Sequence, residues 1–106
     1  MGVASSQRID LAVEALADAF AKRFLKRQRF GLKPGSTAYG RFAEASAMID
    51  QKVPKMPFDR PRLVNVLFDC LEGHWKPQGR AVVPGNLCSD HTWGVLLPQH
   101  LDRMGV

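Results

Sequence analysis

The stretch from residue 19 to residue 43 contains no acidic residue, although it holds seven of the fifteen lysines and arginines of the chain. The rest of the sequence carries eight bases and ten acids. The positive excess behind the formal net charge of +5 therefore lies within one quarter of the molecule. Charge gathered in this way indicates an anionic partner more often than it indicates general solubility.

Long apolar runs are also missing, and none approaches the roughly 20 residues that are needed to cross a bilayer. The first ten residues, MGVASSQRID, show no basic region followed by an apolar stretch, so no secretory signal is predicted. The two cysteines of such a chain indicate a reducing compartment and no disulfide framework. We therefore expect a cytoplasmic protein that has no membrane partner.

Established catalytic and nucleotide-binding patterns are absent as well. The sequence has no GxSxG, HExxH or GxGxxG motif, and the Walker spacing GxxxxGK[ST] does not occur. The carboxylates are scattered, and the close pair Asp69 and Glu72 is expected at a solvent-facing helix end. Cys88, Asp90 and His91 are neighbours in sequence, but a nucleophile and its base need a spatial geometry that adjacency does not supply. We expect a protein that is not an enzyme.

The length and composition predict one compact unit. With 106 residues, 45% of them hydrophobic and 24% charged, the chain is expected to fold as a single domain over residues 1–106. The spacing of its apolar residues predicts a mainly α protein with a three-helix core, a long N-terminal amphipathic helix and a mixed C-terminal third.

The first predicted helix runs from Ser6 to about Phe30, with Ser5 or Ser6 as its cap. Its apolar residues recur three and four positions apart and form one stripe: Ile9, Val13, Leu16, Phe20 and Phe24. Arg27 falls on the same stripe, where burial of an unpaired guanidinium would be costly. The last two turns are therefore expected to project past the core or to bend, which leaves a basic end exposed.

Two further helices complete the predicted core. One runs from Ser36 to about Val53, and the other begins at the cap Asp59 and ends at Gly73. The third helix is apolar on most sides, so it is predicted to be the central element of the core. The segment 52–57 between the two helices is expected to be extended, because a residue that precedes a proline avoids the helical region.

The C-terminal third leaves two alternatives open. Residues 81–83 and 93–97 fit a short β-hairpin around Pro84-Gly85-Asn86, which would make a wing beside three helices. Alternatively, Ser89 and Asp90 cap a fourth helix that enters Trp93. A terminal helix is predicted from residue 98 to residue 104. The apolar residues of this tail are expected to cover the third helix, or otherwise to form a homodimer or partner face.

The basic stretch carries the main functional prediction. Its cations and the hydroxyl of Ser36 are predicted to contact the phosphates of a nucleic acid: Lys22, Arg23, Lys26, Arg27, Arg29, Lys33, Ser36 and Arg41. The loop 31–37 would add backbone N–H groups at the start of the second helix. Phe20, Phe24 and Phe42 are expected in the core, whereas Phe30 and Tyr39 are expected to be exposed. An acidic protein surface is the alternative partner.

A set of cysteines and histidines gives a second prediction. Cys70 and His74 are followed after thirteen residues by Cys88 and His91, and two close pairs with a short linker are the layout of a structural zinc site. The order Cys-His-Cys-His, however, is not that of a zinc finger. Cys70 also lies among apolar positions of the third helix, where a free cysteine acts as a small hydrophobe. A core cysteine is therefore the competing interpretation.

Overall fold

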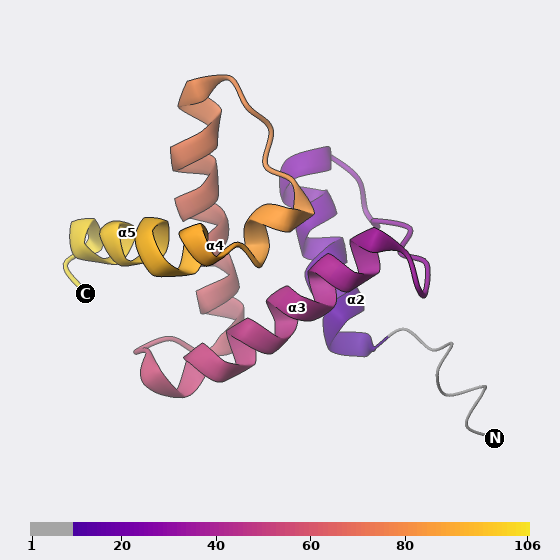
Figure 1. Cartoon of the computed structure of the whole chain (residues 1–106), viewed down its shortest axis with the longest axis horizontal. Helices are drawn as coiled ribbons and strands as arrows, with labels where there is room; N and C mark the ends of the chain where they lie inside the picture. The colour runs from indigo at the N-terminus through magenta and orange to yellow at the C-terminus, as the bar shows by residue number, and fades with distance from the viewer. Residues whose placement is uncertain (1–9) are drawn as a thin grey trace.

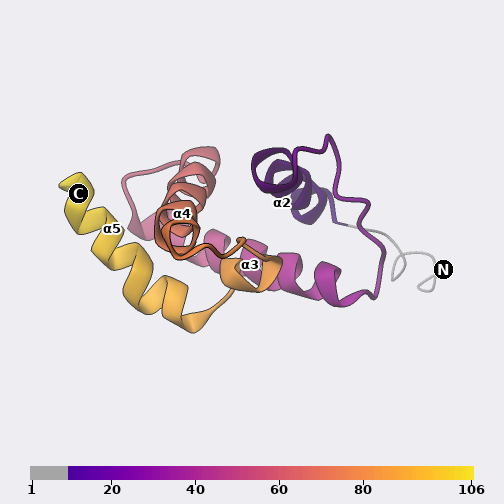
Figure 2. The same ribbon diagram turned by 90° about the horizontal axis from the view of Figure 1, so that it is seen from above.

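The computed structural model describes residues 10–106, so the predicted helix start at Ser6 lies outside the described residues. Its α-helices are α2 (Leu11–Phe20), α3 (Thr37–Lys52), α4 (Arg60–Trp75) and α5 (Leu97–Met104), which are joined by short 3-10 and π-helical segments. α2 and α4 lie on one side of α3, and α5 lies on the side of α4 that faces away from α2 (Figures 1 and 2). This confirms a mainly α fold over the described part of the chain.

The first described helix is capped by Asp10, whose carboxylate accepts the N–H groups of Ala12 at 2.8 Å and Val13 at 3.4 Å. The helix ends with a π-helical turn, Ala21–Leu25, and Lys26 then adopts a left-handed conformation with φ 57°. The prediction that the helix would continue to Phe30 is therefore wrong. The prediction that its basic end would leave the core is confirmed, because Lys26 and Arg27 are exposed.

Contacts of Phe30 explain the early end of this helix. The ring of Phe30 packs against Phe42 and Phe20, with ring centroids 4.9 and 6.2 Å away, and its backbone N–H donates to the Asp18 carboxylate at 3.1 Å. A straight helix would carry Phe30 away from both rings and would return Arg27 to the apolar stripe. The turn at Lys26 avoids both costs.

The second and third predicted helices are present; the third has its predicted cap Asp59, and Ser36 caps the second. The Ser36 Oγ accepts the Tyr39 N–H at 3.1 Å, and the Asp59 carboxylate accepts the Arg62 N–H at 2.9 Å. α4 is the central core helix, with buried Leu63, Val66, Leu67, Phe68, Cys70 and Leu71. It continues two residues past Gly73, and the linker contains a 3-10 turn, Val53–Lys55, where an extended segment was expected.

The C-terminal third is helical, and residues 10–106 contain no strand. The predicted hairpin is therefore not formed, and the alternative with Ser89 is present, because its Oγ accepts the His91 N–H at 3.2 Å. A 3-10 turn, Pro84–Leu87, is followed by a π-helical segment, Thr92–Leu96, that leads directly into α5. The buried residues of this segment follow helical spacing: Thr92, Trp93, Leu96 and Leu97. No helix of the described chain is long and apolar enough to cross a membrane.

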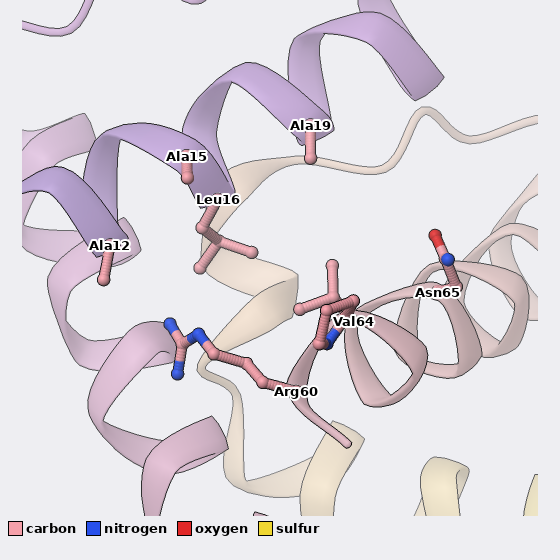
Figure 3. Close-up of a pocket in the computed structure, with 8 residues that line it drawn as sticks. Ala12, Ala15, Leu16, Ala19, Arg60, Val64 and Asn65 are labelled. Carbon is pink, nitrogen blue, oxygen red and sulfur yellow. The ribbon is translucent and has the colours of Figure 1, made fainter. Parts of the chain in front are cut away.

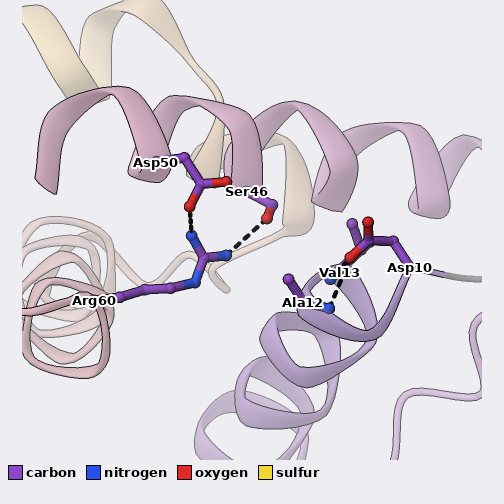
Figure 4. A network of polar contacts seen from close by, with 6 residues as sticks. All are labelled: Asp10, Ala12, Val13, Ser46, Asp50 and Arg60. Atoms are coloured by element: carbon purple, nitrogen blue, oxygen red, sulfur yellow. Dashed lines mark hydrogen bonds and ion pairs between the residues drawn. The ribbon is translucent and has the colours of Figure 1, made fainter.

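A polar network joins the start of α4 to α3 (Figure 4). The Arg60 guanidinium donates to the carboxylate of Asp50 and, at 2.7 Å, to the Oγ of Ser46. Ser46 is one of the few buried polar residues, and this contact satisfies its hydroxyl. The contact ties the first turn of α4 to α3.

Candidate anion-binding site

The C-terminal ends of α2 and α4 lie at the same end of the molecule, at the top of Figure 1. A side-chain contact connects them, because one terminal nitrogen of Arg23 donates to Asp69 at 2.6 Å and to Glu72 at 2.8 Å. These contacts span 46 and 49 residues of sequence. They place the basic end of the first helix beside the segment that follows α4.

A groove of about 240 Å³ lies where these segments meet. We call it the basic groove, because its charged lining consists of Arg23, Lys26, Lys76 and Arg80 with one carboxylate, Glu72. Apolar side chains complete the lining: Phe24, Leu25, Ala81 and Val82. Bases from two separate segments of the chain, residues 23–26 and 76–80, therefore line one concave surface.

The turn that carries Lys76 and Arg80 is fixed by its backbone. The 3-10 turn Lys76–Gln78 ends at Gly79, whose φ of 73° is the left-handed region that favours glycine, and its N–H donates to the Lys76 carbonyl at 2.9 Å. The Arg80 N–H donates to the carbonyl of Trp75 at 3.1 Å, and the Arg80 guanidinium lies 5.9 Å from the centre of the Trp75 indole. The backbone of both bases is thus fixed by the turn, and the Arg80 side chain rests against Trp75.

The bases near the C-terminal ends of α2 and α4 carry more positive charge than the two helix dipoles can balance. The C-terminus of a helix carries roughly half a negative charge, so two such ends balance about one cation. Six exposed bases lie on the segments that meet here, and none has a carboxylate partner within 4.0 Å among residues 10–106: Lys22, Lys26, Arg27, Arg29, Lys76 and Arg80. We call these six residues the basic end. Its excess charge is available to an anionic ligand.

Arg23 has a different role from the other bases of the groove. Its hydrogen bond lowers the pKa of the Glu72 carboxyl, and the two acids together raise the pKa of Arg23. The two carboxylates more than balance the charge of Arg23, and they also fix its position. Both contacts use one terminal nitrogen, so the Nε and the second terminal nitrogen have no hydrogen-bond partner within the described chain.

The structure separates the predicted binding residues into groups. Lys22, Lys26, Arg27 and Arg29 belong to the basic end, while Arg23 is paired with acids. Arg41 lies beside the turn Pro84–Leu87, with its Nε 3.9 Å from the position that a Cβ on Gly85 would occupy. The lining of the basic groove includes none of residues 31–37. The Ser36 Oγ already donates to the Lys33 carbonyl at 2.7 Å and caps α3.

Sequence analysis missed Lys76 and Arg80. The signal was present, because residues 73–80 hold two bases and no acid directly after a helix end. Their proximity to Lys26 nevertheless depends on the packing of α4 beside α2, which no local pattern reports.

The aromatic residues of the basic stretch face the core. Phe20 and Phe42 are buried and Phe24 is partly buried, as predicted. The expectation that Phe30 and Tyr39 are exposed is wrong, because both are half-buried against the core. The Tyr39 hydroxyl accepts the Asp10 N–H at 3.5 Å. These rings do not form an open platform on which bases could stack.

Lys26 lines the basic groove and has an unfavourable backbone conformation, since it is the one non-glycine residue with positive φ in residues 10–106. We expect the substitution Lys26→Gly to yield a protein that is about 1 kcal/mol more stable than the one carrying Lys26→Ala. Both changes remove the same charge, but only glycine relieves the left-handed strain. Urea denaturation of the two variants measures the difference, and equal stability would contradict a strained turn at Lys26.

The predicted zinc quartet is not assembled. No group of three or more histidine, cysteine and acidic side chains is placed to hold a metal ion in the described structure. Cys70 is buried in the core, which raises the pKa of its thiol. Cys88 donates to the Gly85 carbonyl at 3.6 Å, and the rings of His74 and His91 are 6.4 Å apart. Cys70 is therefore a core residue, packed among the buried apolar side chains.

A second, larger groove of about 390 Å³ lies between α2 and the start of α4 (Figure 3). Small residues of α2 form one wall, with Ala12, Ala15 and Ala19 pointing toward α4, and Val64 stands on the other side. This groove is apolar and contains one base, Arg60, which is already paired with Asp50. It therefore offers no site for an anion.

Comparisons with known proteins give no relative: no family model matches the sequence, and no curated protein or solved structure matches it. The function is therefore inferred from the geometry of the chain itself.

Proposed function

We propose that this protein is a non-enzymatic accessory factor that binds nucleic acid through phosphate contacts at its basic end. The observation that supports the proposal is a groove lined by three bases without carboxylate partners, Lys26, Lys76 and Arg80, with three more such bases on the adjoining segment 22–29. Cations that contact phosphates fix the position of a protein on nucleic acid but carry no sequence information. Because the aromatic rings of the basic stretch face the core, we expect weak sequence preference.

Salt dependence tests this proposal most directly. Each neutralised phosphate contributes about −0.9 to the slope of log K against log salt on duplex DNA. With four contacts, affinity for random-sequence DNA falls about 100-fold between roughly 50 and 200 mM salt. The combined substitution Lys22→Gln, Lys26→Gln and Arg27→Gln should reduce the magnitude of the slope by about three. Fluorescence anisotropy across a salt series measures both quantities.

A matched control removes the same charge from the opposite end of α4. Lys52, Lys55 and Arg62 lie at the end of α3 and the start of α4, and their replacement by glutamine should leave the slope within about one of its original value. Binding to neither DNA nor RNA at low salt would contradict the proposal. Equal loss in the two triple variants would mean that net charge, not the basic end, drives binding.

The alternative function is a protein-interaction module, an adaptor or inhibitor whose basic end docks on an acidic protein surface. The observation that favours it is the burial of the aromatic residues, since cations without stacking rings suit any anionic surface equally well. Failure to bind random-sequence DNA and RNA at low salt, with a folded protein, selects this alternative.

A further inference from the structure

We propose that the basic groove binds a phosphate monoester, the phosphate at the end of a nucleic-acid strand, in preference to internal phosphodiesters. This inference rests on the proposed function and adds the ligand class of the groove. Internal phosphodiesters would then contact the bases outside the groove, Lys22, Arg27 and Arg29.

The shape of the site supports a single phosphate group. At about 240 Å³, the basic groove is smaller than the roughly 300–1,000 Å³ of sites that take whole drug-sized ligands. Its lining comes from both sides, residues 23–26 on one and residues 76–82 on the other. A strand end enters such a concave site with little obstruction, whereas a continuous duplex has to pass across its mouth.

The donors of the groove also suit a dianion. Lys26, Lys76 and Arg80 have no carboxylate within 4.0 Å in the described chain, and Arg23 is held with its remaining N–H donors unused. A phosphate monoester carries about 1.5 to 2 negative charges at neutral pH and three acceptor oxygens, while a phosphodiester carries one charge. Bases concentrated around one point favour the group with the higher charge.

Apolar side chains strengthen this preference. Phe24, Leu25, Ala81 and Val82 line the groove between the bases. Apolar walls lower the local dielectric and focus the field of the surrounding charges. The one acid of the lining, Glu72, hydrogen-bonds to Arg23 and also attracts Lys76, so it offsets part of the positive charge, but the bases of the lining outnumber it.

The test compares two labelled single strands of identical sequence, one with a 5′-phosphate and one with a 5′-hydroxyl. We expect the phosphorylated strand to bind about tenfold more tightly, as one additional charge-assisted hydrogen bond would produce. The double substitution Lys76→Gln and Arg80→Gln should abolish the difference between the two strands, whatever affinity for the hydroxyl strand remains. Both side chains are exposed, so the fold is expected to be retained, which circular dichroism checks.

The control is Arg27→Gln with Arg29→Gln, which removes two bases of the basic end that do not line the groove. It should weaken both strands equally and preserve the tenfold ratio. Equal binding of the two strands by the unmodified protein, with steep salt dependence, overturns this inference and leaves the proposed function standing. No binding of either strand overturns both.

A free nucleotide carries the same monoester, so adenosine 5′-monophosphate serves as a third ligand. If the strand end is the ligand, the phosphorylated strand binds at least about tenfold more tightly than the nucleotide, because its further phosphates contact bases outside the groove. Equal affinity for the two ligands overturns the assignment to a strand end.

Discussion

Replacement of Phe20 by alanine is expected to lower the free energy of unfolding by about 3–5 kcal/mol. The Phe20 side chain is 1% exposed, and four rings surround it, those of Phe24, Phe30, Phe42 and Phe68, with centroid distances between 5.0 and 6.3 Å. Alanine would leave a cavity among rings that belong to three helices and a loop. These surroundings are anchored elsewhere and can collapse only partly, so the cost lies at the high end for a core substitution.

Urea denaturation followed by circular dichroism measures this loss, and Leu11→Ala provides the control. Leu11 belongs to the same helix but is 80% exposed, so its replacement should change stability by less than about 0.5 kcal/mol. Phe20→Leu should fall between the two and keeps the comparison possible if the alanine variant does not fold. A loss below about 1 kcal/mol for Phe20→Ala would contradict the packing of α2 against the core.

The parts of the fold that sequence predicts well are those that local chemistry determines. Ser36 and Asp59 accept backbone N–H groups from residues only three positions ahead, so the starts of α3 and α4 are encoded within one turn. α4 likewise has apolar residues on most of its sides, so it has to lie at the centre of the core however the other helices pack. These elements lie where the sequence predicted them.

The end of the first helix is not encoded locally. Its helical pattern continues to Phe30, and Arg27 was the one sign of conflict, because a base fell on an apolar stripe. The structure resolves that conflict through the contact of Phe30 with Phe42, which lies on another helix. Since periodicity does not report such a contact, sequence could predict that the chain leaves the core near Arg27 but not where it turns.

The candidate site shows the same division. The basic stretch can be recognised directly from its residue types. Its position beside Lys76 and Arg80, however, requires α4 to lie beside α2. The ion pair from Arg23 to Glu72 joins residues 49 positions apart, and α2 and α4 are further placed by their shared contact with α3. Sequence therefore identified half of the groove and left the other half to tertiary packing.

The C-terminal segment gives the second large effect, because Trp93 is its main anchor. The indole is 7% exposed, and its Nε1–H donates to the Leu87 carbonyl at 2.8 Å, which ties the last helical segment to the turn Pro84–Leu87. We expect Trp93→Ala to cost about 3–5 kcal/mol through the cavity and the unpaired carbonyl.

Trp93→Phe separates the two parts of this cost. Phenylalanine keeps most of the ring volume but has no donor for the buried carbonyl of Leu87, so we expect a loss of about 1–3 kcal/mol. The fluorescence of Trp75, which lies at the end of α4, reports unfolding in both variants. The loss should be larger for alanine, because alanine leaves a much larger cavity than phenylalanine does. If Trp93→Ala instead cost less than about 1 kcal/mol, the tail would not be part of the core, and its apolar residues would be available to a partner.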